Sequence, residues 1–143
     1  MSLTTDPDIE RLALAMVGCT LPKAEWTHAG HFAAALWLLR HRPDLAAPDA
    51  MRELIMRYNE STGTANTDDG GYHHSITVAS LRAAAWHLGR HGGDAPLHGV
   101  LAALMASAQG RSDWLLAHWR RETLFSVAAR RDWVAPDLAA LPF

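Results

Sequence analysis

Three histidines in two separate segments could together hold a metal ion. His28 and His31 lie in the stretch EWTHAGHFAAALWLL, which is otherwise apolar on nearly every side, and His73 lies in a later segment. The spacing His-x-x-His places two imidazoles on adjoining faces of a helix, as chelation of one ion requires. Three imidazoles and a water suit catalytic zinc, and nitrogen ligands also suit nickel, copper and ferrous iron. The sequence therefore predicts a metal site at His28, His31 and His73, with zinc as the expected ion.

Two carboxylates are candidates for proton transfer beside that ion. Glu25 begins the histidine stretch and could be a fourth ligand, the acceptor that fixes a ring's tautomer, or the catalytic base. Asp69 lies in the polar stretch that precedes His73. The ion would polarise a carbonyl group of a small-molecule substrate or lower the pKa of a bound water, and Glu25 or Asp69 would move the proton. The residues expected to line the substrate pocket are Asn66, Asp68, Tyr72 and Thr77.

Each histidine also has an explanation that requires no metal. His28 and His31 could form hydrogen bonds to Glu25 or to a loop backbone, and His73 could cap the start of a helix. His87 lies near the end of a predicted helix, where an imidazole interacts favourably with the helix dipole. The sequence leaves the choice between ligands and structural histidines open.

Two further functions are compatible with structural histidines. The chain could be a non-catalytic helical interaction module that forms a homodimer, with Trp26 and Trp37 on the far side of the histidine helix as the dimer surface. Alternatively, the polar stretch could close over a small organic molecule that is bound without metal. Metal binding, with or without enzymatic activity, is the first of these three predictions.

Composition excludes several classes of protein. The 143 residues are sufficient for one domain with one core, and the formal net charge of -2 with no basic stripe gives nucleic acid no binding surface. Cys19 is the only cysteine, so no internal disulfide can form and a reducing compartment is expected. The first residues are acidic and no apolar stretch is long enough to span a bilayer, so we expect a cytoplasmic protein without a membrane partner.

The elements that must position these residues are helices. Alanine and leucine dominate, and apolar residues recur at three- and four-residue spacing, which predicts an all-α fold: a single compact bundle of six or seven helices, residues 1–143, with one long polar loop. The predicted helices cover residues 6–17, 22–41, 48–60, 72–90, 96–110 and 113–122, with a short seventh after Ser126.

The second and fourth predicted helices must bring the histidines together. If the two pack roughly parallel, His73 at the start of one meets His28 and His31 near the start of the other. The polar loop at residues 59–71 would then cover the same end of the bundle and bring Asp68 and Asp69 within reach.

Three segments, THAGH at 27–31, NESTGTANTDDGGYHHSIT at 59–77 and LFSVAARRDWVAPDL at 124–138, together resemble a family of small uncharacterised bacterial helical proteins. That family joins a Thr-His-x-x-His helix to a Gly-Tyr-His-x-Thr-x-Thr segment. The chain departs from the pattern at His74, where an acid is expected, and at Ser75, where threonine is expected. The resemblance carries no activity, but it implies that the shared site includes His28, His31, Gly71, Tyr72, His73 and Thr77.

Overall fold

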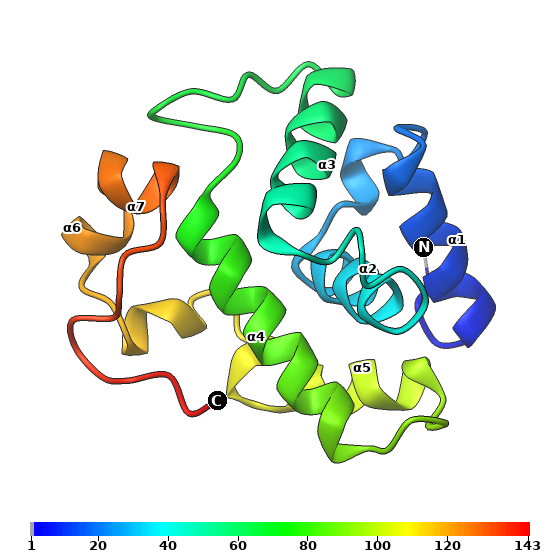
Figure 1. Cartoon of the computed structure of the whole chain (residues 1–143). Coiled ribbons are helices and arrows are strands. Elements are labelled where there is room, and N and C mark those ends of the chain that lie inside the picture. The colour runs from blue at the N-terminus through cyan, green and yellow to red at the C-terminus, as the bar shows by residue number, and fades with distance from the viewer. Residues whose placement is uncertain (1) are drawn as a thin grey trace.

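Seven α-helices make up most of the chain, of which the computed structural model describes residues 2–143 (Figure 1). The helices are α1 (Asp6–Val17), α2 (His28–His41), α3 (Pro48–Ser61), α4 (His74–Arg90), α5 (Leu97–Ala106), α6 (Arg121–Leu124) and α7 (Val127–Arg131). Short 3₁₀ turns lie at Lys23–Glu25, Ala108–Gly110 and Trp114–Ala117. The predicted all-α fold is confirmed, although α5 ends earlier than predicted because the backbone becomes extended at Ser107.

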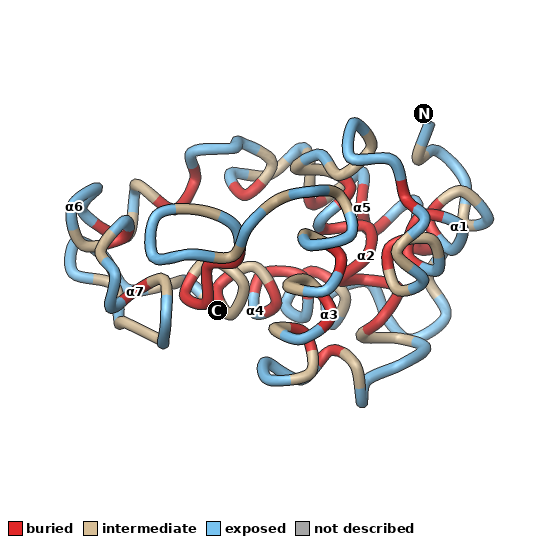
Figure 2. The backbone as a smooth tube through the Cα atoms, turned by 90° about the horizontal axis from the view of Figure 1, so that it is seen from above, coloured by how far each residue is buried: buried red, intermediate tan, exposed pale blue. Residues whose placement is uncertain are grey.

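The centre of the fold is α2, which is buried because nearly all of its side chains are apolar. Every residue from Phe32 to Leu38 is buried, and α1, α4 and α5 pack against this helix. Figure 2 shows the buried class running along α2. A helix that is apolar all round requires such neighbours. Trp37 is 9% exposed and packs in the core, so it does not present the dimer surface that the sequence predicted.

The second predicted helix is interrupted near its start. A 3₁₀ turn covers Lys23–Glu25, and α2 begins only after Thr27, whose hydroxyl oxygen accepts a hydrogen bond from Gly30 N at 3.1 Å. A Cβ atom at position 30 would lie 2.7 Å from the Glu25 carbonyl oxygen, so this close approach requires glycine. The interruption places Glu25 outside the helix that carries the two histidines, which corrects the predicted arrangement.

The predicted long polar loop connects α3 to α4 and spans residues 62–73. Gly71 in this loop has a φ of +76°, a conformation that favours glycine, and a Cβ there would overlap the Ala65 carbonyl oxygen. The helix that follows begins at His74, two residues later than predicted, because His73 occupies the N-cap position with extended backbone.

The C-terminal region contains shorter elements than the sequence predicted. The expected sixth helix divides into the 3₁₀ turn Trp114–Ala117 and α6. The Asp137 carboxylate accepts hydrogen bonds from Arg120 N at 2.8 Å and from Thr123 Oγ1 at 2.6 Å, so a residue from beyond α7 starts α6 as a separate helix. Ser126 caps α7 as predicted.

Candidate functional site

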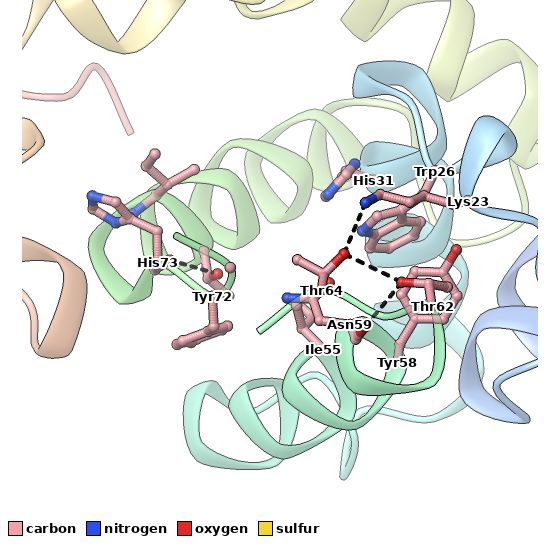
Figure 3. Close-up of a pocket in the computed structure, with 13 residues that line it drawn as sticks. Lys23, Trp26, His31, Ile55, Tyr58, Asn59, Thr62, Thr64, Tyr72 and His73 are labelled. Atoms are coloured by element: carbon pink, nitrogen blue, oxygen red, sulfur yellow. Dashed lines mark hydrogen bonds between the residues drawn. The ribbon is translucent and has the colours of Figure 1, made fainter. Parts of the chain in front are cut away.

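A pocket of about 350 Å³ lies where the turn before α2, the end of α3 and the start of α4 meet (Figure 3). The loop 62–73 forms one part of its wall. The lining residues are Lys23, Trp26, His31, Ile55, Tyr58, Asn59, Thr62, Thr64, Gly71, Tyr72, His73, Ile76 and Thr77. The pocket therefore includes His31, Tyr72, His73 and Thr77, which the sequence predicted, and also Gly71, which the resemblance implied.

A narrower recess of about 70 Å³ adjoins this pocket and extends toward the core. It shares five lining residues with the larger space: Trp26, His31, Ile55, Ile76 and Thr77. Its other lining residues are nearly all apolar: Met16, Ala34, Ala35, Met51, Ser80 and Leu81. We call the two spaces together the amphipathic pocket, because the outer chamber carries most of the polar side chains and the recess beside it is lined almost entirely by apolar ones.

His31 lies where the chamber meets the recess. Its Nδ1 donates a hydrogen bond to the Thr27 carbonyl oxygen at 2.6 Å, and its ring centroid lies 3.8 Å from that of Trp26. The ring faces the pocket, and the surrounding protein removes much of the water around it. This desolvation lowers the pKa of His31. The hydrogen bond to Thr27 opposes the decrease, and the charge of His28 adds to it. A neutral ring with Nδ1 protonated leaves the Nε2 lone pair facing the pocket as an acceptor.

Several polar side chains line the outer chamber, and Lys23 is the one among them with a full charge. The Lys23 ammonium donates to Thr64 Oγ1 at 2.9 Å, which leaves two further N–H groups. Most of the other polar groups have partners within the protein: Thr62 Oγ1 donates to the Asn59 carbonyl oxygen at 2.9 Å, and Tyr58 OH donates to the Leu21 carbonyl oxygen at 3.0 Å. The chamber therefore offers a cation in a rigid polar wall.

His73 lines the same chamber, but both of its ring nitrogens have partners. Nδ1 accepts a hydrogen bond from Ile76 N at 3.2 Å, and Nε2 donates to the Leu124 carbonyl oxygen at 2.6 Å. Burial lowers the pKa of this imidazole, which suits the neutral form that these two bonds need. The ring lies beyond the first turn of α4, away from His31 (Figure 3). Capping of the helix start, one of the two explanations offered by the sequence, is confirmed for His73.

His28 lies outside the amphipathic pocket. Its Nε2 donates to the Gln109 carbonyl oxygen at 2.8 Å, so its partner is a loop backbone. Gln109 also accepts a hydrogen bond at Oε1, from His87 Nε2 at 3.0 Å, and this buried amide therefore ties α2 to α4. The sequence did not predict this side-chain partner of His87.

The structure does not bring the three predicted ligands together. The helices cross instead of lying parallel, since α2 is seen nearly along its axis in Figure 1 while α4 runs across the view. The rings of His28, His31 and His73 consequently have three different carbonyl partners. Within residues 2–143, no three His, Cys, Asp or Glu side chains are grouped as they would be around an ion.

The predicted acids lie on two separate segments, Glu25 before α2 and the other two in the loop 62–73. Glu25 is half-buried, and its Oε1 is buried without a hydrogen-bond partner among residues 2–143. Asp69 is exposed on the loop, where its backbone N–H donates to Thr67 Oγ1 at 3.2 Å. Asp68 forms a two-pronged pair with Arg131, at 2.8 and 2.7 Å, and the Arg131 guanidinium lowers the pKa of that carboxyl. These three acids do not line the amphipathic pocket.

Asn66 holds the loop in place with its whole side-chain amide. Oδ1 accepts hydrogen bonds from Asn59 Nδ2 and from Tyr72 N, each at 3.0 Å, and Nδ2 donates to the Met56 carbonyl oxygen at 3.0 Å. The residue was predicted to bind a ligand. These bonds fix the wall of the chamber against α3, and Asn66 also lines a separate pocket of about 160 Å³, so ligand binding by this residue stays a prediction.

Tyr72 and His74 form a buried pair at the start of α4. Tyr72 OH donates to His74 Nδ1 at 2.7 Å, and burial raises the pKa of the phenol and lowers that of the imidazole, so both groups are held neutral. Thr77, which lines both chamber and recess, donates through Oγ1 to the His73 carbonyl oxygen at 2.9 Å. The histidine at position 74 therefore acts as an acceptor for the neighbouring tyrosine.

Several lining residues escaped the sequence analysis, chiefly Lys23, Trp26, Tyr58, Asn59, Thr62 and Thr64. One signal could have pointed to them. Lys23 is the only lysine in the chain, and it directly precedes the histidine stretch. The contact that places it in the chamber, however, joins residues 41 positions apart and has no local signature.

No described helix, within residues 2–143, is both long enough and apolar enough to cross a bilayer. Comparisons with protein-family models, curated proteins and solved structures gave no match to this chain.

Proposed function

We propose that the chain binds a small amphipathic organic molecule, with the polar group of the ligand in the outer chamber and its apolar part in the recess. The observation that supports this proposal is that an outer space of about 350 Å³, with Lys23 and several hydroxyl and amide groups in its lining, adjoins an apolar space of about 70 Å³ with which it has five lining residues in common. Ligand sites in proteins are typically concave and apolar with a few placed polar groups.

The charge in the chamber favours a carboxylate as the polar group. Lys23 is the charged lining residue, and it keeps two N–H groups free beside the hydroxyl of Thr64. His31 is neutral and offers an acceptor, which suits a hydroxyl or amide group elsewhere on the ligand. A ligand that combines a carboxylate with a second, donating group would satisfy both residues.

The apolar part of the ligand would contact Trp26 and the small side chains of α2. Ala34 and Ala35 leave room where larger residues would close the recess, and Met16 and Met51 supply flexible walls. Each methylene group that leaves water for such a site contributes about 0.8 kcal/mol, or about fourfold in affinity.

Metal binding, predicted from the sequence, stays a prediction with weaker support. His73 would have to leave a partner at one of its two ring nitrogens before it could ligate an ion, and His28 and His31 are each bonded through one ring nitrogen to different carbonyl oxygens, at 2.8 and 2.6 Å. Homodimer formation and a cytoplasmic location likewise stay predictions.

Titration of the full chain with straight-chain carboxylic acids of increasing length tests the proposed function, with heat of binding and tryptophan fluorescence as readouts. The affinity should rise about fourfold per methylene until the recess is filled and then level off. Ser80→Leu, which fills the recess, should remove this dependence on length. Ala102→Leu, on the exposed face of α5, is the matched control and should bind as the wild type does.

Lys23→Gln tests the contribution of the carboxylate group to affinity separately from that of the apolar part of the ligand. It should weaken carboxylates by about tenfold, as expected for loss of a charge-assisted hydrogen bond, and leave alcohols of the same length unaffected. The proposal fails if no member of the series binds saturably, or if Ser80→Leu behaves like Ala102→Leu.

A further inference from the structure

A second pocket, of about 160 Å³, lies between α3, α7 and the loop 62–73, and it is strongly basic. Three arginines line it: Arg52 from α3, and Arg130 and Arg131 from α7. The one carboxylate in its lining is that of Asp68. We call this space the arginine pocket. It neighbours the amphipathic pocket, since Tyr72 lines both.

The carboxylates near the arginine pocket do not balance its positive charge. Asp68 is already paired with Arg131 through two hydrogen bonds of 2.8 and 2.7 Å. Asp132 lies with Oδ1 3.9 Å from Arg52 Nη2, but its side chain is 87% exposed and does not line the pocket, so solvent screens this pair. Two guanidinium charges are therefore left without a close counter-charge inside the pocket.

These two guanidinium groups are held in place and still have hydrogen-bond donors to offer. Arg52 Nη2 donates to the Arg131 carbonyl oxygen at 2.9 Å, and the guanidinium lies 5.3 Å from the centre of the Tyr72 ring. Arg130 Nη1 donates to the carbonyl oxygens of Gly71 and Tyr72, each at 3.2 Å. Arg130 Nε is buried and has no hydrogen-bond partner in the described part of the chain, residues 2–143. Because Nε is enclosed by protein, the donors of Arg130 left for an anion are those of its other terminal nitrogen, Nη2.

The loop adds a hydroxyl group to this set. Thr67 Oγ1 accepts hydrogen bonds from Asp69 N at 3.2 Å and from Gly70 N at 3.1 Å, so its own proton is free to donate. Guanidinium groups match the oxygen geometry of phosphate, and arginines that converge from separate elements surround a tetrahedral anion better than a flat one.

We propose that the arginine pocket binds a tetrahedral oxyanion, either inorganic phosphate or the phosphoryl group of a small ester. Arg52 and Arg130 contact the anion directly, while Arg131 contributes charge and stays paired with Asp68. This proposal rests on a different cavity from the amphipathic ligand, and either can fail without the other.

Calorimetric titration of the full chain with inorganic phosphate and with glycerol phosphate, at constant ionic strength set by sodium chloride, tests the site. Wild type should bind at least one of the two probes saturably. Arg52→Gln should weaken that binding about tenfold or more, because it removes a charged donor. Arg90→Gln is the matched control: Arg90 lies over the Trp86 ring at the other end of α4, and its loss should leave the affinity unchanged. The probe that binds more tightly identifies the source of the phosphoryl group.

Asp68→Asn distinguishes a binding site from a purely structural cluster. It removes the carboxylate that competes with the anion, so it should tighten phosphate binding several-fold even though it weakens the tie to Arg131 and lowers the melting temperature. The site is refuted if neither probe binds beyond the effect of sodium chloride. It is also refuted if Arg52→Gln and Arg130→Gln both bind as the wild type does.

Discussion

The ring nitrogen Nε2 of His31 gives the amphipathic pocket a hydrogen-bond acceptor. The ring is oriented by its bond to the Thr27 carbonyl oxygen and by its stacking on Trp26, so Nε2 presents an acceptor at a fixed place. The imidazoles of His73 and His28 each donate a hydrogen bond to a backbone carbonyl oxygen of a distant segment. Chemical identity alone therefore did not decide which histidine faces the pocket.

His73 should make the stability of the protein depend on pH. Burial, its largest cause, lowers the pKa of His73 in the folded chain below the ordinary value of about 6.5. The unfolded chain then binds the proton more readily, so stability is lost as the pH falls below that value. The free energy of unfolding should decrease from about pH 7.5 to about pH 5, as measured by urea unfolding.

His73→Asn supplies the test of that assignment. Asparagine can still accept the hydrogen bond from Ile76 N at the helix start but does not titrate, so the variant should lose less stability on acidification than the wild type does. His41→Asn, at an exposed position at the end of α2, should retain the pH dependence of the wild type. An equal loss in all three proteins would show that His73 does not cause the effect.

At the scale of elements, the sequence predicted best those boundaries that have local causes. α1 occupies the predicted residues because Thr5 caps it, with its hydroxyl oxygen accepting from Asp8 N at 3.3 Å. α3 begins at Pro48, a residue type that is favoured in the first turn of a helix. The division of the sixth predicted helix depends instead on Asp137, which reaches back to Arg120 N. No window of neighbouring residues contains that information.

The loop 62–73 should depend on Asn66 more than on any acid it carries. Asn66→Ala removes three hydrogen bonds of 3.0 Å, and at about 1 kcal/mol for each the loss should reach about 2 to 3 kcal/mol of unfolding free energy in urea denaturation. Asp69→Ala, in the same loop but exposed, should change stability by less than about 0.5 kcal/mol. Similar losses in the two variants would contradict the assigned role of Asn66.

At the scale of the whole molecule, α2 organises the fold. The sequence predicted the all-α class and the burial of this helix, because a segment without a polar face can only be a core element. It did not predict the crossing of α2 and α4, which separates His28 from His73 and so determines whether a shared site can form. That crossing is accompanied by packing among α1, α2, α4 and α5, and by Gln109, whose backbone carbonyl oxygen accepts from His28 and whose Oε1 accepts from His87.

The central place of α2 predicts where substitutions destabilise the whole chain. Leu36 is 0% exposed in the middle of this helix, so Leu36→Ala should lower the free energy of unfolding by about 2 to 5 kcal/mol. Leu138→Ala provides the comparison, since that side chain is 52% exposed, and it should cost less than about 0.5 kcal/mol. Thermal and urea unfolding measure both, and equal effects would mean that α2 is not the core of the fold.

The fastening of the loop to α7 has a consequence for biosynthesis. Arg130 holds the carbonyl oxygens of Gly71 and Tyr72, and Arg131 holds Asp68, so the wall shared by the two pockets is braced by residues translated after it. While the ribosome has yet to release α7, the emerging chain has α2, α3 and α4 but lacks these braces. The wall shared by the two pockets should therefore become fixed only after α7 has left the ribosome.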